Sequence, residues 1–195
     1  MSGAPLVGAH LLGLADAARQ TVEALAAELD EIVNDVAATL LAGGKLMFCG
    51  NGGSAADAQH LATEYVVRFR REGRPLAAIA LTTDTSLLTA AANDMGFVEV
   101  FARQVEALGR PGDLLILHST SGNSPNLVAA AETARRRGVR TVALLARGGG
   151  QLRALVDRAV VLPIDDGAHA QELQLAIGHA VCDEIERRLR GDAEA

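Results

Sequence analysis

The stretch LMFCGNGGS, residues 46–54, joins an apolar run to a glycine-rich turn at the start of an expected helix. The apolar run predicts a buried strand. A glycine-rich turn between a strand and a helix exposes backbone N–H groups at the positive end of the helix dipole, which suits a phosphate. The turn lacks the third glycine of the dinucleotide fingerprint and the Walker lysine. It therefore points to a small phosphorylated metabolite; the alternative is a turn that only lets the strand enter the helix tightly.

Two residues able to bind a metal or move a proton follow this turn. His60 and Glu64 are four residues apart, so both lie on one face of the expected helix. Arg68 follows at the same spacing and is expected on the same face. A simple contact between neighbours one turn apart is the alternative for His60 and Glu64. The phosphate turn before them favours a functional pair.

A second candidate phosphate loop, HSTSGNSP at residues 118–125, also follows an apolar run and precedes a helical pattern. Its hydroxyl groups can donate to phosphate oxygens without adding charge, and they belong to Ser119, Thr120, Ser121 and Ser124. Ser124 also suits the N-cap position, with Pro125 at the first helical position. Capping alone needs one hydroxyl rather than four, so phosphate binding is the favoured interpretation.

Apolar runs alternate with helical patterns after residue 44, which predicts a parallel sheet covered on both faces. The expected strands are 45–49, 77–81, 113–118, 141–145 and 159–162, and the expected helices are 54–71, 85–93, 98–107, 124–137 and 168–190. The predicted fold is thus a doubly wound α/β domain with a five-stranded parallel sheet flanked by helices. Ligands of such folds bind beyond the carboxyl ends of the strands, where both loops fall.

A long amphipathic pattern precedes the first strand. Apolar residues recur at helical spacing from Leu11 to Leu41 and end before Gly43 and Gly44. We therefore expect an N-terminal helical oligomerisation segment, residues 1–44, and a domain that binds a phosphorylated metabolite, residues 45–195, with a frayed tail at 191–195. The apolar stripe between residues 22 and 40 is too long to leave exposed on a monomer, which predicts a homo-oligomer.

Composition excludes several classes of protein. Aromatic residues make up 3% of the 195 residues, tryptophan is absent and the net charge is −6, so we expect no nucleic-acid partner. No apolar run approaches the roughly 20 residues that span a bilayer, and no secretory signal is evident. The two cysteines, Cys49 and Cys182, form no CxxC pair and are expected to be reduced. We predict a soluble cytoplasmic protein without a membrane partner.

Several motifs together resemble the sugar isomerase (SIS) superfamily. These are CGNGGSAADAQH at 49–60 with Glu64, AAND at 91–94, STSGNSPN at 119–126, and Gln171 and Glu172 followed by His179. Within that superfamily they resemble the phosphoheptose isomerases, which interconvert sedoheptulose 7-phosphate and glycero-manno-heptose 7-phosphate. The resemblance covers essentially the whole chain, and its motifs are specific in combination.

The resemblance implies a role for each matching residue. Substrate contacts are implied for Asn51, Gly52, Gly53, Ser54, Glu64, Arg68, Asn93, Asp94, Ser119, Thr120, Ser121, Ser124 and Gln171, with the hydroxyl residues holding the phosphate. Zinc ligands are implied at His60, Glu64, Gln171 and His179, with one ion per subunit, and Glu64 and His179 are the expected catalytic base and acid. The resemblance also implies a homotetramer with active sites at subunit interfaces.

Some features keep alternatives open. Gln171 and His179 are eight residues apart, about 12 Å along one helix, so they could serve different points of a site or different subunits. A helix histidine facing the core is the alternative for His179. Gln174 stands where relatives often carry a histidine, His118 replaces a small or apolar residue, and the loop at 164–168 is short and acidic.

The function expected from these residues is aldose–ketose isomerisation through an enediol or enediolate. The alternatives are a non-enzymatic SIS regulator, resembling the replication-initiator-associating proteins, and an isomerase or sensor for another phosphosugar. A binding-only protein has no reason to keep His179 beside His60, Glu64 and Gln171, which favours the enzyme.

Overall fold

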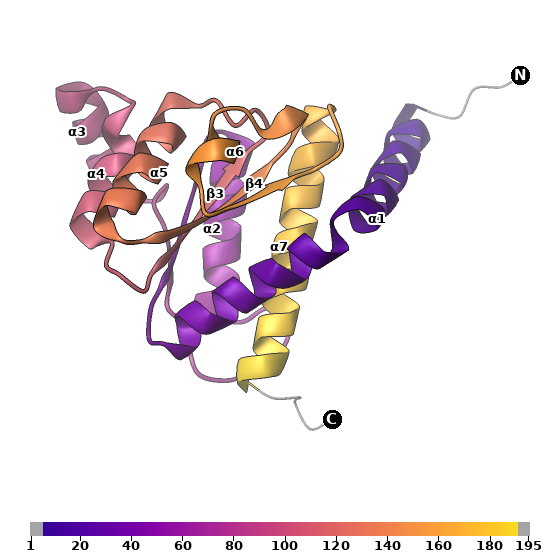
Figure 1. Ribbon diagram of the computed structural model, residues 1–195, viewed down its shortest axis with the longest axis horizontal. Helices are drawn as coiled ribbons and strands as arrows, with labels where there is room; N and C mark the ends of the chain where they lie inside the picture. The colour runs from indigo at the N-terminus through magenta and orange to yellow at the C-terminus, as the bar shows by residue number, and fades with distance from the viewer. Residues whose placement is uncertain (1–5, 191–195) are drawn as a thin grey trace, which may run out of the picture.

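Five parallel strands form one sheet in the order β2-β1-β3-β4-β5 (Figure 1). The computed structural model describes residues 6–190. The strands are β1 (Leu46–Gly50), β2 (Ala78–Ala80), β3 (Leu114–Ser119), β4 (Arg140–Leu145) and β5 (Arg158–Val161). Every predicted strand is confirmed, and no end differs by more than one residue from its expected position.

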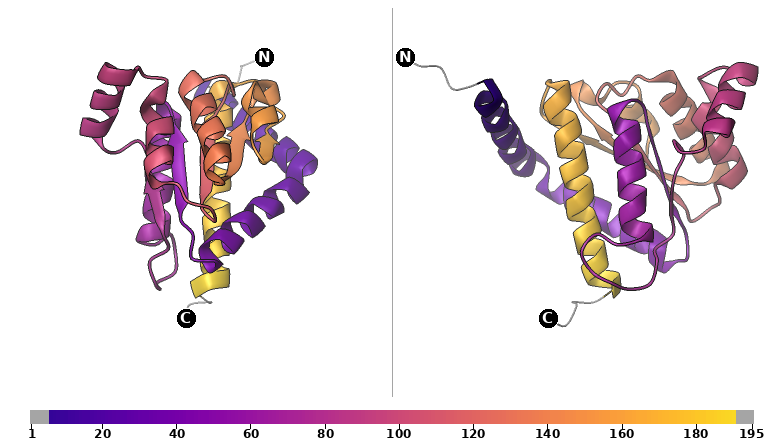
Figure 2. Two further views of the ribbon diagram at one scale, coloured as in Figure 1. Left: turned by 60° about the vertical axis from the view of Figure 1, so that its left-hand side comes forward. Right: turned by 180° about the vertical axis from the view of Figure 1, so that it is seen from behind.

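Helices cover both faces of this sheet (Figure 2). They are α1 (Leu6–Leu41), α2 (Gly53–Val66), α3 (Thr85–Met95), α4 (Glu99–Leu108), α5 (Pro125–Arg137), α6 (Leu152–Leu155) and α7 (Gly167–Arg190). Alternate residues of β1 show the two layers: Leu46 and Phe48 pack with α1, α2 and α7, while Met47 and Cys49 pack with α4 and α5. Burial on both faces explains why the strands are continuously apolar. The short α6 was not predicted, because four residues carry no periodic pattern.

The two halves of α1 have different environments. The helix loses helical geometry at Leu25, where φ is −133°. Beyond this kink, Ile32, Val36 and Leu40 are buried in the core against α2 and α7. The prediction that the whole stripe needs a partner subunit is therefore wrong for its C-terminal half, which the chain covers itself. The N-terminal half leans away from the sheet (Figure 1) and leaves Val22 60% exposed.

Helix α2 is shorter than predicted, because it ends at Val66 instead of residue 71. The carboxylate of Glu186 accepts hydrogen bonds from the backbone N–H groups of Phe69, Arg70 and Arg71, at 2.8, 2.8 and 2.7 Å. These amides are thus satisfied by a side chain of α7, and the helix stops before them. Arg68 consequently lies outside the helix instead of on the face of Glu64. It forms an ion pair with Glu72 at 3.7 Å.

The remaining expectations concern the ends of the chain and the membrane. The predicted frayed tail, residues 191–195, lies outside the described residues, and the division of the chain at residue 44 stays a prediction. Across residues 6–190, no helix combines the length and the apolar composition that crossing a bilayer requires.

Candidate active site

The two predicted phosphate loops lie side by side at the centre of the sheet. β1 and β3 are neighbours, and Gly50 is in register with His118. From this pair the sheet extends through β2 on one side and through β4 and β5 on the other. This is the topological switch point of a doubly wound sheet, where ligands of such folds bind.

A cavity of about 160 Å³ joins the two loops. Its lining includes Asn51 and Ser54 from the first loop, and Ser119, Thr120, Ser121 and Ser124 from the second. The amide side chains of Asn51 and Asn126 exchange two hydrogen bonds, at 2.9 and 2.8 Å, and so tie the first loop to α5. The cavity offers hydroxyl groups and the start of two helices, which suits an anion.

The hydroxyl loop is shaped by its own hydrogen bonds. Ser119 Oγ accepts from the backbone N–H of Gly122 at 3.0 Å, and Ser121 Oγ accepts from that of Asn123 at 3.3 Å. Ser124 occupies the N-cap position of α5 with Pro125 next, as predicted, but its side chain makes no capping hydrogen bond. Capping therefore does not account for the Ser124 hydroxyl, which remains able to bind a ligand.

The glycines of the first loop are required by two separate constraints. Gly52 has φ of +58°, a conformation that other residues rarely adopt. Gly53 packs against the side chain of Gln171, and a Cβ there would lie 2.1 Å from Gln171 Nε2. Gln171 is thus placed at the N-terminus of α2, beside the phosphate loops.

His60, Glu64 and His179 come together on the facing surfaces of α2 and α7. His60 Nε2 lies 2.8 Å from His179 Nε2 and 3.2 Å from Glu64 Oε1. A hydrogen bond between two imidazole nitrogens uses one proton and one lone pair, so at most one of the facing nitrogens is protonated. The three residues offer ligand atoms within 4.8 Å of one another. Two nitrogens and one oxygen at this spacing fit a zinc ion.

Gln171 is separated from this group. It contacts Gly53, whereas His60 follows seven residues later on α2, about 10 Å along the axis. The predicted role of Gln171 as a fourth metal ligand stays a prediction.

The ring of His179 is held from both sides. It stacks on Phe69 with centroids 4.9 Å apart and planes 13° apart, and it meets the His60 ring edge-on. Burial and the neighbouring His60 lower the pKa of His179 more than Glu64 raises it. His179 is therefore neutral near pH 7, the form that binds metal or accepts a proton.

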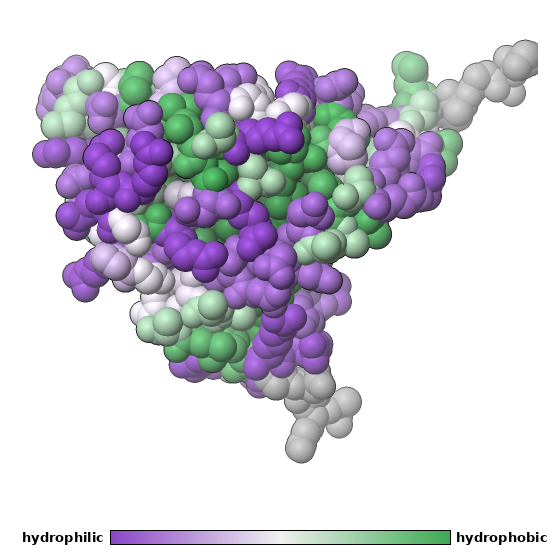
Figure 3. Space-filling model, in the orientation of Figure 1, coloured by the Kyte–Doolittle hydropathy of each residue, from purple (hydrophilic) through white to green (hydrophobic). Residues whose placement is uncertain are grey.

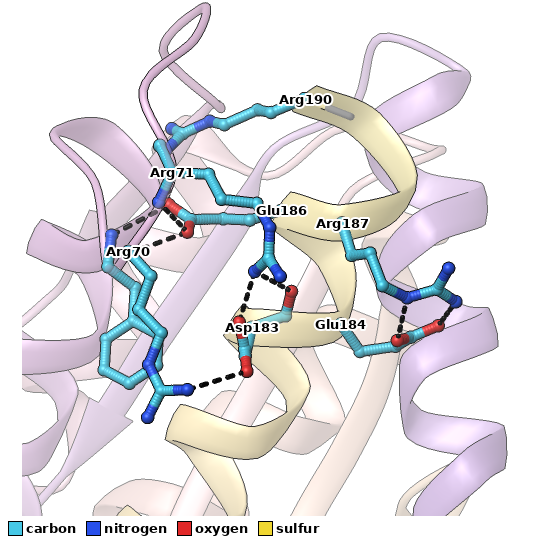
Figure 4. A network of polar contacts seen from close by, with 8 residues as sticks. Arg70, Arg71, Asp183, Glu184, Glu186, Arg187 and Arg190 are labelled. Atoms are coloured by element: carbon cyan, nitrogen blue, oxygen red, sulfur yellow. Dashed lines mark hydrogen bonds and ion pairs between the residues drawn. The ribbon is translucent and has the colours of Figure 1, made fainter. Parts of the chain in front are cut away.

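A charged network on α7 fixes the loop that carries Phe69 (Figure 4). Glu186 is fully buried, pairs with Arg190 and accepts the three backbone N–H groups described above. Burial raises the pKa of Glu186, but these donors outweigh it and hold the pKa below its ordinary value. Asp183 adds ion pairs to Arg70 and Arg71. The network thereby sets the position of Phe69 on His179.

Other predicted residues lie elsewhere. Asn93 and Asp94 are exposed at the end of α3, joined by a 2.7 Å hydrogen bond, and neither lines the 160 Å³ cavity. Gln174 is fully buried and donates to the Leu144 carbonyl at 2.8 Å, so it links α7 to β4. His118 is also fully buried, but it belongs to the lining of the 160 Å³ cavity.

Comparison with known proteins agrees with this geometry. The SIS domain family matches residues 13–146. A phosphoheptose isomerase from Akkermansia muciniphila is 49% identical over 182 residues, covering 93% of this chain and 96% of that protein. The chain belongs to the SIS family of phosphoheptose isomerases. It is accordingly an isomerase, and a non-enzymatic regulator is not favoured.

Solved structures of this family have the same fold. A phosphoheptose isomerase from Francisella tularensis superimposes with a TM-score of 0.90 at 35% identity, covering 93% of this chain and 96% of that one. The enzyme from Neisseria gonorrhoeae gives 0.87 at 42% identity, covering 92% and 96%. The match extends over nearly all of both chains, so the long N-terminal helix belongs to the family fold.

Sequence reasoning missed the supporting residues of the site. Phe69 stands in an arginine-rich run at the end of the predicted helix 54–71, and nothing in the sequence links Glu186 to residues 69–71. Asp57 is one turn before His60, which was an available signal. It is buried, one of its carboxylate oxygens has no hydrogen-bond partner within residues 6–190, and burial raises its pKa although His60 opposes this.

Proposed function

We propose that this protein interconverts D-sedoheptulose 7-phosphate and D-glycero-D-manno-heptose 7-phosphate. The observation that carries the proposal is the separation of the phosphate loops from the His60–Glu64–His179 group. His60 follows Ser54 by six residues on α2, about 9 Å along the helix. In a heptose 7-phosphate the phosphate and the reacting carbons, C1 and C2, are at opposite ends of the sugar. A phosphate in the 160 Å³ cavity would therefore direct the reacting end toward Glu64 and His179.

The substrate would be held along this path. The hydroxyls of Ser119, Thr120, Ser121 and Ser124 would donate to the phosphate, together with backbone N–H groups at the start of α2 and α5. Asn51, Gly52, Gly53 and Gln171 would contact the sugar chain. Asn93, Asp94 and Arg68 are exposed and do not line the 160 Å³ cavity, so we propose that they contact sugar hydroxyls where subunits meet.

Isomerisation moves one proton between C1 and C2 while the oxygen protons are exchanged. Glu64, whose side chain is 14% exposed, would act as the base that takes the carbon proton and returns it to the neighbouring carbon. His179 would donate to and accept from the oxygens. Its depressed pKa keeps it neutral, so it can give one ring proton and receive another.

We propose zinc, one ion per subunit, as the cofactor, held by His60, Glu64 and His179. Gln171 lies apart from these three residues within one chain, so it would complete the site only from another subunit. When bound, zinc would supply Lewis-acid polarisation of the carbonyl and hydroxyl oxygens. Ligation lowers the basicity of a carboxylate, so the roles of Glu64 as ligand and as base compete.

We also propose a cytoplasmic homotetramer. The N-terminal half of α1 exposes Leu11, Leu12 and Val22 at 58%, 64% and 60%. Figure 3 shows apolar groups on the face between the N-terminal half of α1 and the rest of the molecule. Burial of that surface in a second subunit would remove it from water. The buried, unpaired thiols of Cys49 and Cys182 suit a reducing compartment.

The direct test is incubation of purified, metal-analysed protein with sedoheptulose 7-phosphate, with aldose formation followed over time. Glu64→Gln should abolish turnover, whereas Glu132→Gln, an exposed carboxylate on α5, should not. Absence of aldose at saturating substrate and zinc would refute the proposal.

A further inference from the structure

A second group of metal-ligating side chains lies between the N-terminal half of α1 and the start of α7. His10 comes from α1, and His169 and Glu172 come from α7. Each offers a ligand atom within 4.8 Å of the others. The group includes no residue of the candidate active site, and neither of its histidines belongs to a sequence motif. His169 and Glu172 are one turn apart on α7, whereas tertiary packing brings His10 to them, because Glu172 follows it by 162 residues.

The distances in this group suit a metal ion. His10 Nε2 lies 3.1 and 3.2 Å from the two carboxylate oxygens of Glu172. Two ligands of a tetrahedral zinc ion, with bonds of about 2.0–2.1 Å, are about 3.3 Å apart. His10 and Glu172 are therefore already spaced as two ligands of one ion. Both side chains are accessible to an ion, with exposed fractions of 41% and 43%.

The third residue has the hydrogen bond that metal-binding histidines need. His169 Nε2 lies 3.1 Å from the backbone carbonyl oxygen of His10. A carbonyl oxygen only accepts, so Nε2 carries the proton and Nδ1 carries the lone pair. A ligating histidine almost always donates its other N–H to a carbonyl, carboxylate or water. The ring lies beside that of His10, with centroids 4.4 Å apart.

The local structure holds these residues in place. Gly13 lets the His169 ring lie against α1, since a Cβ there would be 2.8 Å from His169 Cε1. Asp166 accepts hydrogen bonds from the backbone N–H groups of Ala168 and His169, at 2.8 and 2.9 Å, and so fixes the first turn of α7. Ala17, Ala170 and Leu173 form an apolar contact between the same two helices.

We propose that His10, His169 and Glu172 bind one divalent transition-metal ion of the zinc class, separate from the ion proposed at His60. Two imidazole nitrogens and one carboxylate oxygen leave a fourth position for water. The ion links the N-terminal half of α1 to the start of α7. Zinc binding between these two elements therefore stabilises the packing of the N-terminal half of α1 on α7.

The test measures zinc binding in a chain that lacks the other candidate site. Full-length protein with His60→Ala and His179→Ala is freed of metal and titrated with ZnCl2 by calorimetry. We expect one equivalent per chain and a rise in Tm with zinc. Adding His10→Ala or Glu172→Gln should weaken binding by about tenfold or more. Adding Glu132→Gln, an exposed carboxylate on α5, should change nothing.

The Glu172→Gln variant distinguishes a metal site from a simple hydrogen bond between His10 and residue 172. The amide oxygen still accepts a hydrogen bond from His10 but is a poorer ligand than a carboxylate. Loss of the zinc-dependent rise in Tm, with the metal-free Tm retained, supports the ion. Absence of saturable binding in the His60→Ala, His179→Ala background, or binding insensitive to both His10→Ala and Glu172→Gln, overturns the proposal. In the otherwise unchanged chain, His10→Ala should remove one equivalent of bound zinc while isomerase turnover persists, which distinguishes this site from the proposed active site.

Discussion

Acid should destabilise this protein through His118. The side chain is fully buried in β3, and neither ring nitrogen makes a hydrogen bond within the described part of the chain. Burial in these surroundings lowers the pKa of His118 to about 4. The neutral ring is thus tolerated in the folded protein, whereas the charged ring is not.

The magnitude follows from linkage. The pKa falls from an ordinary value of 6.5 to about 4 on folding, and one pKa unit corresponds to about 1.4 kcal/mol. The unfolded chain therefore binds the proton more tightly, and the free energy of unfolding rises with pH between these values. As the pH falls from 6.5 to 4, His118 alone should remove about 3 kcal/mol of stability.

The assay compares wild type with His118→Leu by urea unfolding at several pH values and one protein concentration. Leucine fills the site without titrating, so the pH dependence of the difference isolates His118. At pH 7.5 we expect the variant to be at least as stable as wild type, because it removes two unpaired buried nitrogens. At pH 4 the free energy of unfolding of the variant should exceed that of wild type by about 3 kcal/mol more than at pH 7.5. A difference in the free energy of unfolding that stays constant with pH would refute the reasoning, since it would show that His118 keeps an ordinary pKa in the folded protein.

Three further predictions concern the site. Glu64→Gln should lower kcat by about 10²–10⁴-fold with an unchanged circular dichroism spectrum, and retention of a tenth of the activity would assign the base elsewhere. Ser119→Ala with Ser121→Ala should mainly raise KM for the phosphorylated sugar, and an equal loss of affinity for the dephosphorylated analogue would count against the phosphate site. Glu186→Gln should cost about 3–5 kcal/mol of stability by urea unfolding and also lower kcat, because Phe69 loses its position; unchanged turnover would separate the network from the active site.

The sequence determined the parts of this protein that depend on neighbouring residues. Continuous apolar runs predicted each strand to within one residue, since only a sheet covered on both faces needs them. The glycine turn at 50–53 and the hydroxyl loop at 119–124 were predicted at the same edge of the sheet, because parallel strands present their carboxyl ends at one edge. That their strands, β1 and β3, are neighbours was shown only by the structure. The spacing of His60 and Glu64 fixed their shared helix face.

The tertiary structure alone decided which distant residues join His60 and Glu64. His179 lies 119 residues after His60, yet their Nε2 atoms are 2.8 Å apart because α7 packs along α2. The end of α2 at Val66 was mispredicted for the same reason: the competing acceptor, Glu186, comes from α7. Local spacing specifies a side chain's direction on its own helix. It does not specify which buried carboxylate, ring or carbonyl that side chain meets, because such contacts depend on how complete helices pack against each other.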